Sequence, residues 1–194
     1  MILTKEDLRE YLCADAKANA RGSVRAKLFG DEIWKYIVTL RKTEYYTNQT
    51  GLYGKITLPF RIFYKFRLHN LGIKLGYSIP INAIQKGFAL VHYGTIVIAN
   101  GTQIGENCRI HEGVTIGATN GSRKAAVIGN NVFLATGAKI IGEVSIADDV
   151  AIAANAVVTK SILEKGTTWG GIPAKKISDN DSHSNLSKLL CEVE

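Results

Sequence analysis

Two histidines and one carboxylate in the middle of the chain have the types and spacing that proton chemistry needs. His92 follows Leu90 by two residues, and Glu112 follows Ile110 by two residues, directly after His111. A neutral imidazole is a suitable general base near pH 7, because its reference pKa is about 6.5. Three repeat steps lead from Leu90 through Ile98 and Ile104 to Ile110, the first of them two residues longer than six. Glu112 is therefore predicted to stack next to His92 in the following turn of the repeat, about 4.8 Å away. Glu112 could then fix the tautomer of His92. The alternative is that both histidines only decorate exposed corners.

A metal site is not expected. Zinc needs three or four converging ligands, and the two central histidines do not supply them. The other two histidines lie outside the central region, and the three cysteines lack metal-ligand spacing. These residues are His69, His183, Cys13, Cys108 and Cys191.

Large aliphatic residues recur every six positions through the second half of the chain. Smaller apolar residues follow most of them by four positions, and residues that tolerate positive φ follow most by three. A hexapeptide period is the signature of a parallel β-helix, whereas an antiparallel sandwich has turn signals roughly every 8 to 12 residues. The large aliphatics are Ile98, Ile104, Ile110, Ile116, Ile128, Leu134, Ile140, Ile146, Ile152 and Val158.

The chain is predicted to have three parts. Residues 1–76 form an α-helical region, residues 77–178 form the β-helix, and residues 179–194 form a polar tail with a short helix at 186–191. Helices are predicted at 4–20, 31–46 and 58–71 from capping residues and apolar periodicity. Residues 118–127 lack inward aliphatics and are predicted to form a protruding loop. The fold class is mainly β.

The third predicted helix interleaves aromatic residues with Arg61, Lys65 and Arg67. Such a segment could suit a membrane surface. The favoured interpretation is that the helix packs its aromatic side chains on the first coils and exposes its cations. Membrane association is therefore open but not expected.

The net charge of +7 allows three kinds of partner: nucleic acid, an anionic membrane, or a polyanionic small molecule. The basic residues are scattered and form no compact nucleic-acid motif, so no nucleic acid partner is expected. The start, MILTKEDLREYL, lacks the apolar core of a signal peptide, and no apolar run reaches membrane-spanning length. We therefore expect a cytoplasmic protein.

Several motifs carry a resemblance to a known family. HYGTIVI, IGENCRIHEGVTIGAT and GGIPAKKI resemble the hexapeptide-repeat acetyltransferases, specifically the serine acetyltransferase branch and its capsule and exopolysaccharide relatives. The resemblance covers roughly residues 77–178. It implies a left-handed parallel β-helix, a homotrimer with active sites in the grooves between neighbouring prisms, and acetyl-CoA as the acetyl donor without a metal.

The resemblance also implies roles for single residues. His92 matches the catalytic histidine that takes the proton from the acceptor hydroxyl during its attack on the thioester. Lys175 matches the basic residue that meets the CoA phosphates, which agrees with the excess of lysine near the C-terminal coils. Gly117, Thr136 and Ala154 match family positions along the pantetheine arm of CoA. Thr159 and Lys160 match positions near the far end of that arm.

The chain departs from serine acetyltransferases where they hold the acceptor. Val91 replaces an aspartate that helps hold the amino group of serine, Tyr77 aligns near the aspartate that orients the histidine, and Ala125 replaces a second histidine. These departures predict a neutral sugar hydroxyl in surface polysaccharide biosynthesis as the acceptor, with Tyr93 and His111 as acceptor-binding residues.

Three alternatives stay open. The first is O-acetylation of L-serine for cysteine biosynthesis, the second is acetylation of an amino sugar or a small antibiotic, and the third is a non-catalytic solenoid. The role of Trp169 is also open between stacking on adenine and packing.

Overall fold

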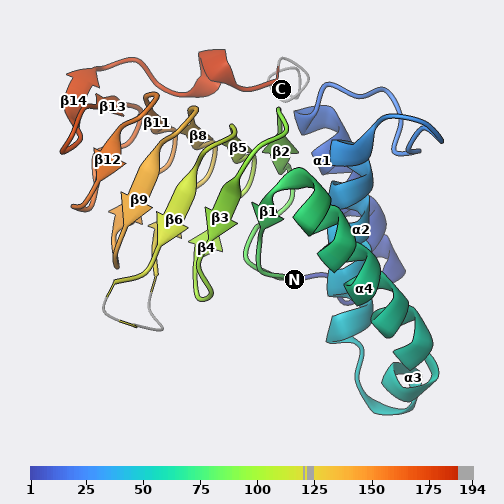
Figure 1. The fold of residues 1–194 in the computed structure, drawn as a ribbon. Coiled ribbons are helices and arrows are strands. Elements are labelled where there is room, and N and C mark those ends of the chain that lie inside the picture. Colours follow the sequence, from blue (N-terminus) through green and yellow to red (C-terminus); the bar gives the residue numbers. More distant parts are fainter. Residues whose placement is uncertain (120, 122–124, 188–194) are drawn as a thin grey trace.

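The computed structural model describes residues 1–119, 121 and 125–187. Figure 1 shows a stack of β coils that extends to one side of a group of helices, with the first coils against the helices. Four helices precede the β strands in the sequence: α1 (Lys5–Ala18), α2 (Glu32–Asn48), α3 (Gly51–Ile56) and α4 (Leu58–Leu75). Among the helices of the described residues, none is long and apolar enough to span a bilayer.

Local sequence explains the helix ends that were predicted. The Thr4 side chain accepts a hydrogen bond from the Asp7 backbone N–H, and the Asp7 side chain accepts one from the Thr4 backbone, which forms a capping box at α1. α4 continues one turn beyond the predicted end and stops at Gly76, whose φ of 81° is accessible to glycine. α3 was not predicted, since its six residues carry no amphipathic period.

A buried ionic network fastens the helices to the first coil. The Arg41 Nε donates to Asp15 Oδ2 over 2.7 Å, and both side chains have no exposed surface. Arg41 also donates to Glu44 and to the backbone carbonyls of Ile84 and Gln85. The helical region is therefore attached to the β-helix through charged hydrogen bonds as well as apolar packing.

The strands form three sheets that are parallel apart from the last pair of the third sheet. The first sheet has the order β1-β3-β6-β9-β12, the second β10-β7-β4, and the third β14-β13-β11-β8-β5-β2. Apart from the antiparallel pair of β13 and β14, each pairing joins strands one full coil apart, so the chain winds as a three-sided parallel β-helix. The bounds are Tyr77–Ser78 (β1), Ala89–Leu90 (β2), Ile96–Ile98 (β3), Gln103–Ile104 (β4), Arg109–Ile110 (β5), Thr115–Gly117 (β6), Val127–Ile128 (β7), Phe133–Leu134 (β8), Lys139–Ile141 (β9), Ser145–Ile146 (β10), Ala151–Ile152 (β11), Val157–Val158 (β12), Thr168–Gly170 (β13) and Lys175–Ser178 (β14).

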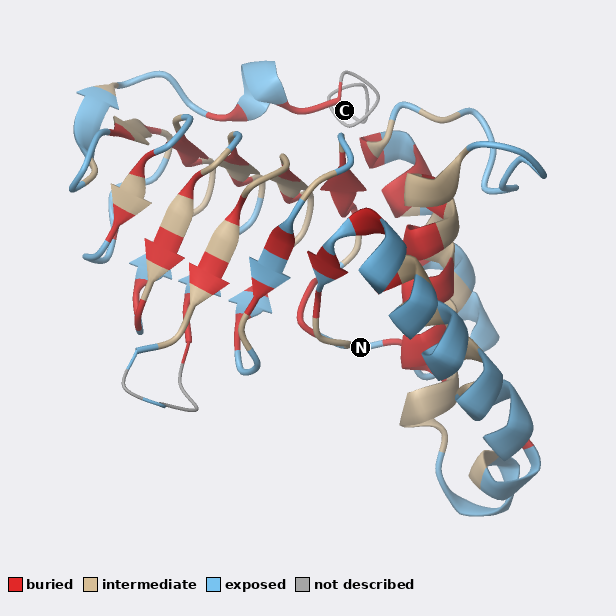
Figure 2. Cartoon of the chain, in the orientation of Figure 1, coloured by how far each residue is buried: buried red, intermediate tan, exposed pale blue. Residues whose placement is uncertain are grey.

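The core is the predicted column of aliphatic residues. All ten large aliphatics of the six-residue period are buried, each at most 3% exposed. Asn107, Asn131, Asp149 and Asn155 adopt positive φ at the corners, as their type and spacing predicted. Figure 2 shows buried strands along the inner side of the coils. Trp169 pairs in register with Ile152 and packs against the core, which favours the packing alternative for this residue.

The expected packing of α4 is wrong. Only Gly72 and Leu75 of this helix are buried, whereas Phe60, Phe63 and Phe66 are each more than half exposed. The physical reason is that α4 lies along α2, where Phe60 and Tyr64 stack on Tyr46, so these rings meet a helix and not the coils.

Two predicted segments are described only in part. In the loop predicted at 118–127, residues 120 and 122–124 lie outside the described residues. Most of the short helix predicted at 186–191 also lies outside them, and the described part of the tail contains a 3-10 turn, η1 (His183–Asn185).

Candidate active site

One corner of the β-helix collects the candidate catalytic residues. Leu90 pairs with Ile110, Ile110 with Leu134, and Leu134 with Ile152, each one coil apart. The residues two positions later therefore form one column, which we call the corner column: His92, Glu112, Thr136 and Ala154. The register of β2 and β5 places Glu112 next to His92, as the repeat count predicts.

Gly94 allows this close stacking. Its φ is 136°, and a Cβ added there would lie 2.9 Å from the Cβ of Glu112. A larger residue at this position would therefore displace the carboxylate from beside His92.

The two imidazoles lie beside each other. The ring centroids of His92 and His111 are 5.8 Å apart at an interplanar angle of 85°. On its other side His111 meets Phe133 edge to face, with centroids 5.0 Å apart. Burial lowers the pKa of His111, and nearby Arg109 lowers it further while Glu112 opposes this. His111 is thus held neutral next to His92.

Glu112 is a stabilised carboxylate. Its pKa lies below the usual range, mainly because the carboxylate accepts a hydrogen bond from its own backbone N–H; the Thr136 side chain and the two histidines add to this effect, while burial opposes it. In the described part of the chain no hydrogen bond joins Glu112 to His92, and neither Glu112 Oε2 nor His111 Nε2 has a partner although both atoms are buried. Buried polar atoms without a partner are rare, so both atoms are candidates for a hydrogen bond to a bound polar group.

Tyr77 holds the backbone of His92. Its hydroxyl donates to the His92 carbonyl oxygen over 2.7 Å, and its ring packs edge to face on Tyr36. Burial raises the pKa of Tyr77 to about 12, so the hydroxyl stays protonated and keeps donating. Sequence analysis placed Tyr77 only near the position of an orienting aspartate and missed this hydrogen bond, because a contact between a side chain and a backbone carbonyl leaves no residue pattern.

The candidate CoA contacts lie at two edges of the first sheet. Gly117 ends β6, and Thr159 follows β12 in the same column, next to exposed Lys160. Thr136 and Ala154 are exposed in the corner column, at the other edge of this sheet. A Cβ on Gly117 would meet only Ile141 Cδ1, at 3.5 Å, so packing alone does not require glycine there.

Two further predicted site residues, Lys175 and Tyr93, have exposed side chains. Lys175 begins β14, which pairs with β13 in the third sheet, and its side chain is exposed. Tyr93 is 59% exposed beside His92. In the described ranges no group of three histidine, cysteine, aspartate or glutamate side chains could hold a metal ion.

A cavity opens beside the residue that precedes His92. It has a volume of about 460 Å³ and is lined by Val91, Leu90, Asn19, Leu186 and others. Arg109 is its one charged lining residue among those described. The buried Arg109 Nε has no hydrogen-bond partner in the described chain, and burial lowers the pKa of this guanidinium. Sequence patterns missed this residue, because Arg109 occupies an ordinary outward position of the repeat.

Comparison with known families matches the repeats. Residues 125–160 match the family model described as bacterial transferase hexapeptide (six repeats). The six-residue repeats of this segment are therefore similar to those of bacterial hexapeptide transferases. The serine acetyltransferase of Helicobacter pylori is 39% identical over 101 residues, which are 51% of this chain and 58% of that protein. The serine acetyltransferase of Staphylococcus epidermidis is 35% identical over 122 residues, which are 58% of this chain and 57% of that protein.

Solved structures share the fold. A serine acetyltransferase in complex with CoA has a TM-score of 0.69 at 20% identity and covers 89% of this chain and 71% of its own. A serine acetyltransferase from Brucella abortus has a TM-score of 0.66 at 24% identity and covers 91% of this chain and 70% of its own. The predicted left-handed β-helix of the hexapeptide-repeat domain is confirmed.

The comparisons correct the predicted acceptor. The relatives are serine acetyltransferases, so the sugar hydroxyl and the role in polysaccharide biosynthesis are wrong, and the capsule and exopolysaccharide branch is not supported. Val91 in place of an aspartate removes one polar side chain and does not by itself exclude serine as the acceptor. The hexapeptide-repeat chain spans less than two thirds of the length of the curated relatives it matches.

Proposed function

We propose that this protein is an acetyl-CoA-dependent serine O-acetyltransferase with His92 as its general base. The observation that carries the proposal is the corner column, which stacks an imidazole on a stabilised carboxylate and continues into Thr136 and Ala154, two candidate CoA contacts. The similarity to serine acetyltransferases supports the acceptor.

The proposed chemistry is a direct transfer. His92 accepts the proton of the serine hydroxyl while that oxygen attacks the thioester carbonyl carbon, and the C–S bond then breaks. The proton returns to the departing CoA sulfur, so atoms and charge balance. Glu112 stabilises the imidazolium that forms on His92, and Tyr77 fixes the backbone that carries the imidazole.

The donor site draws on the cations of the C-terminal coils. Lys160 and Lys175 are exposed, and their charge suits a polyanion such as CoA. The other candidate CoA contacts border the first sheet: Gly117, Thr136, Ala154 and Thr159. In the single chain His92 and Tyr93 are exposed. A second copy against this corner would enclose them, which supports a homotrimer with sites between neighbouring chains.

The test of this function is release of CoA thiol from acetyl-CoA by the full chain with L-serine as acceptor. We expect turnover that depends on L-serine, with O-acetylserine detected by mass spectrometry. The active species should have three times the 21.1 kDa mass of the chain. Absence of O-acetylserine at millimolar L-serine with intact acetyl-CoA binding would falsify the acceptor. Absence of acetyl-CoA binding would overturn the whole proposal.

Arg109 is proposed to pair with the carboxylate of serine in the cavity beside Val91. Replacing it in Arg109→Gln should raise the KM for L-serine by about 10- to 100-fold, because a hydrogen bond between charged groups is lost. The kcat should change much less. Steady-state kinetics with L-serine as the varied substrate measures both constants. Arg9→Gln, which neutralises an exposed arginine of α1, is the control. An unchanged KM in Arg109→Gln would remove Arg109 from the acceptor site.

Glu112 is proposed as a positioning and charge-stabilising residue. Replacing it in Glu112→Gln should lower kcat by about tenfold, less than the 10²- to 10⁴-fold usual for the general base itself. The carboxylate acts on the charge that forms on His92 during transfer, so its loss should lower kcat and leave the KM for acetyl-CoA nearly unchanged. Steady-state kinetics with acetyl-CoA as the varied substrate measures both constants. A KM for acetyl-CoA that rises as much as kcat falls would leave Glu112 with a structural role only.

A further inference from the structure

The outer face of α4 is an exposed apolar surface. Ile62, Phe63, Phe66 and Ile73 are 60%, 53%, 67% and 70% exposed, and we call them the α4 stripe. At 100° per residue, Ile62, Phe66 and Ile73 lie almost in one line along the helix, with Phe63 beside them. From Ile62 to Ile73 the line runs about 16 Å. The α4 stripe is therefore continuous along the helix.

The opposite face of α4 already has its partners. Leu68 and Leu71 pack against the core together with buried Leu75, and Tyr64 stacks on Tyr46 of α2 with ring centroids 5.4 Å apart. Tyr64 also carries Lys42 over its ring. The α4 stripe thus points away from the rest of the chain, and Figure 2 shows the outer side of this helix exposed.

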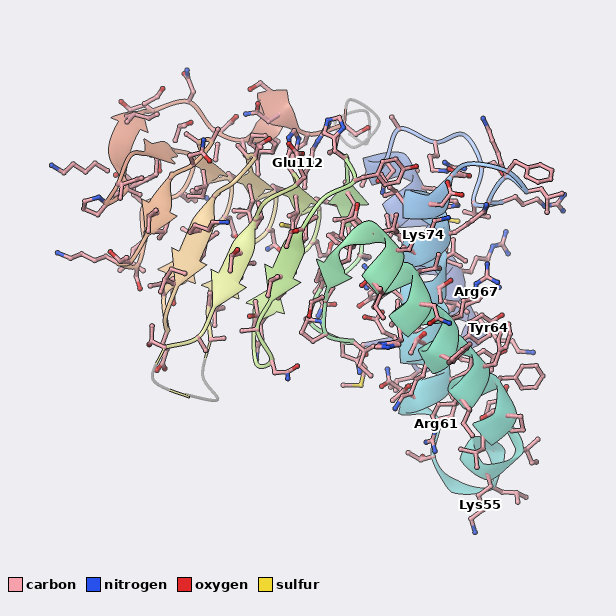
Figure 3. The ribbon with its side chains drawn as sticks, viewed as in Figure 1. Lys55, Arg61, Tyr64, Arg67, Lys74 and Glu112 are labelled. Atoms are coloured by element: carbon pink, nitrogen blue, oxygen red, sulfur yellow. The ribbon has the colours of Figure 1, made fainter. Side chains whose placement is uncertain are left out.

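Cations border the α4 stripe on both sides. The helical spacing places Lys65 on one side and Arg67 and Lys74 on the other, with Lys55 and Arg61 near the α3 end. Figure 3 shows Lys55, Arg61, Arg67 and Lys74 spread along α3 and α4. Within the described chain only Lys74 of this set has an ion pair, a 3.9 Å contact with Glu32. The positive charge of this surface is therefore almost uncompensated.

The composition of the surrounding sequence strengthens that charge. Residues 45–105 contain no aspartate or glutamate, although they include all of α3 and α4. α3 adds two exposed apolar residues, Leu52 and Ile56, at 75% and 64%. The occupant of this surface must accept both apolar side chains and a cluster of positive charge.

This charge pattern favours a membrane over a second copy of the chain or a peptide as the partner of this surface. A second copy joined through the same face would bring the cations of one α4 against those of the other, with no carboxylate from this region to compensate them. The surface is also a convex helix rather than a groove for a peptide. An apolar stripe flanked by lysine and arginine is instead the pattern of helices that lie in the interface of an anionic bilayer.

We propose that the outer face of α4 binds the surface of an anionic phospholipid membrane. The α4 stripe enters the boundary between headgroups and acyl chains, while Lys65, Arg67 and Lys74 meet the lipid phosphates. The loop before α2 lies close by, because Arg25 and Phe63 line one cavity of about 570 Å³. That loop also exposes two apolar side chains, Leu28 and Phe29, at 82% and 86%.

Vesicle flotation of the full chain tests the proposal. Vesicles of phosphatidylcholine with roughly one third phosphatidylserine should carry the protein upward, and pure phosphatidylcholine vesicles should not. Raising the salt from about 0.1 to 0.5 M should weaken binding by screening the lysine and arginine charges. No flotation with the anionic vesicles, or equal flotation with both kinds, would overturn the proposal.

Two pairs of matched variants test the two parts of the surface. Lys65→Gln/Arg67→Gln should weaken binding about 25-fold, roughly fivefold for each cation, while Lys5→Gln/Lys17→Gln removes as much charge from α1 without this loss. Phe66→Ser/Ile73→Ser should weaken binding by about 100-fold or more, while Leu163→Ser/Ile177→Ser, on exposed apolar residues of the last coils, should not.

The same variants separate a membrane from a second copy. All of the substituted residues are exposed, so circular dichroism should show intact folds. The mass of each variant in solution by light scattering should equal that of the unchanged protein. A lower mass for Phe66→Ser/Ile73→Ser would identify the α4 stripe as a contact between copies and overturn the membrane proposal. Flotation does not depend on acetyl transfer, so the outcome is independent of the proposed function.

Discussion

The His92→Ala variant is expected to lose about 10²- to 10⁴-fold in kcat with L-serine, the usual contribution of a general base. In the proposed reaction His92 accepts the proton of the serine hydroxyl, and its loss would leave that proton without an imidazole at this corner to accept it. His111, 5.8 Å away between ring centroids, does not replace it, since His111 is held by Phe133 on its other side. Initial rates of thiol release measure the loss.

Binding of acetyl-CoA distinguishes a chemical defect from a structural one. The candidate CoA contacts lie along the first sheet and on the last coils, so the dissociation constant of acetyl-CoA for His92→Ala should change by less than about threefold. His69→Ala, an exposed histidine of α4, is the matched control and should keep full activity. A His92→Ala enzyme with undiminished kcat would remove His92 from the mechanism.

The fold could be predicted because its signal repeats. All ten large aliphatics are buried inside the coils, and the asparagine and glycine residues three positions after them all adopt positive φ. The stacking of Glu112 on His92 followed from the same count, since a parallel register is fixed once the coil length is known. A repeated pattern therefore specified both the architecture and the corner column.

Contacts that occur once were not predicted. The Tyr77 hydroxyl reaches the His92 carbonyl and Arg109 lines a cavity with Val91, but neither contact repeats and neither has a residue signature. The packing of α4 failed for a related reason. The helix is apolar on both faces, so its sequence could not tell which face meets α2 and which stays exposed. The acceptor was mispredicted because the absence of single contacts was given more weight than the similarity of the whole repeat domain.

The buried network between the helices and the first coil should dominate stability. In Asp15→Ala the Arg41 guanidinium loses the carboxylate to which both its Nε and Nη2 donate, and it stays buried. The Phe88 backbone N–H also loses its acceptor, Asp15 Oδ1 at 2.8 Å. Removing one partner of a buried ion pair costs about 3 to 5 kcal/mol of unfolding free energy. Urea denaturation should show this as a lower midpoint.

The two tryptophans can show which part of the chain loses this stability. Trp34 lies in α2 and Trp169 lies in β13 at the other end of the coils, so Trp169→Phe leaves a probe of the helical region and Trp34→Phe leaves a probe of the β-helix. In each background Asp15→Ala should lower the midpoint reported by Trp34 more than that reported by Trp169, because the network joins α1 and α2 to the first coil only.

Removing the other charges of the network should restore part of the loss if uncompensated charge is its cause. Asp15→Ala/Arg41→Met/Glu44→Gln removes the cation and neutralises the second carboxylate that pairs with it, so this triple variant should be more stable than Asp15→Ala alone. Asp7→Ala, which removes the Asp7 side of the α1 capping box, should cost only about 1 kcal/mol. If Asp15→Ala costs no more than Asp7→Ala, or the triple variant is the least stable of the three, the charged network does not hold the helices to the β-helix, and apolar packing alone must do so.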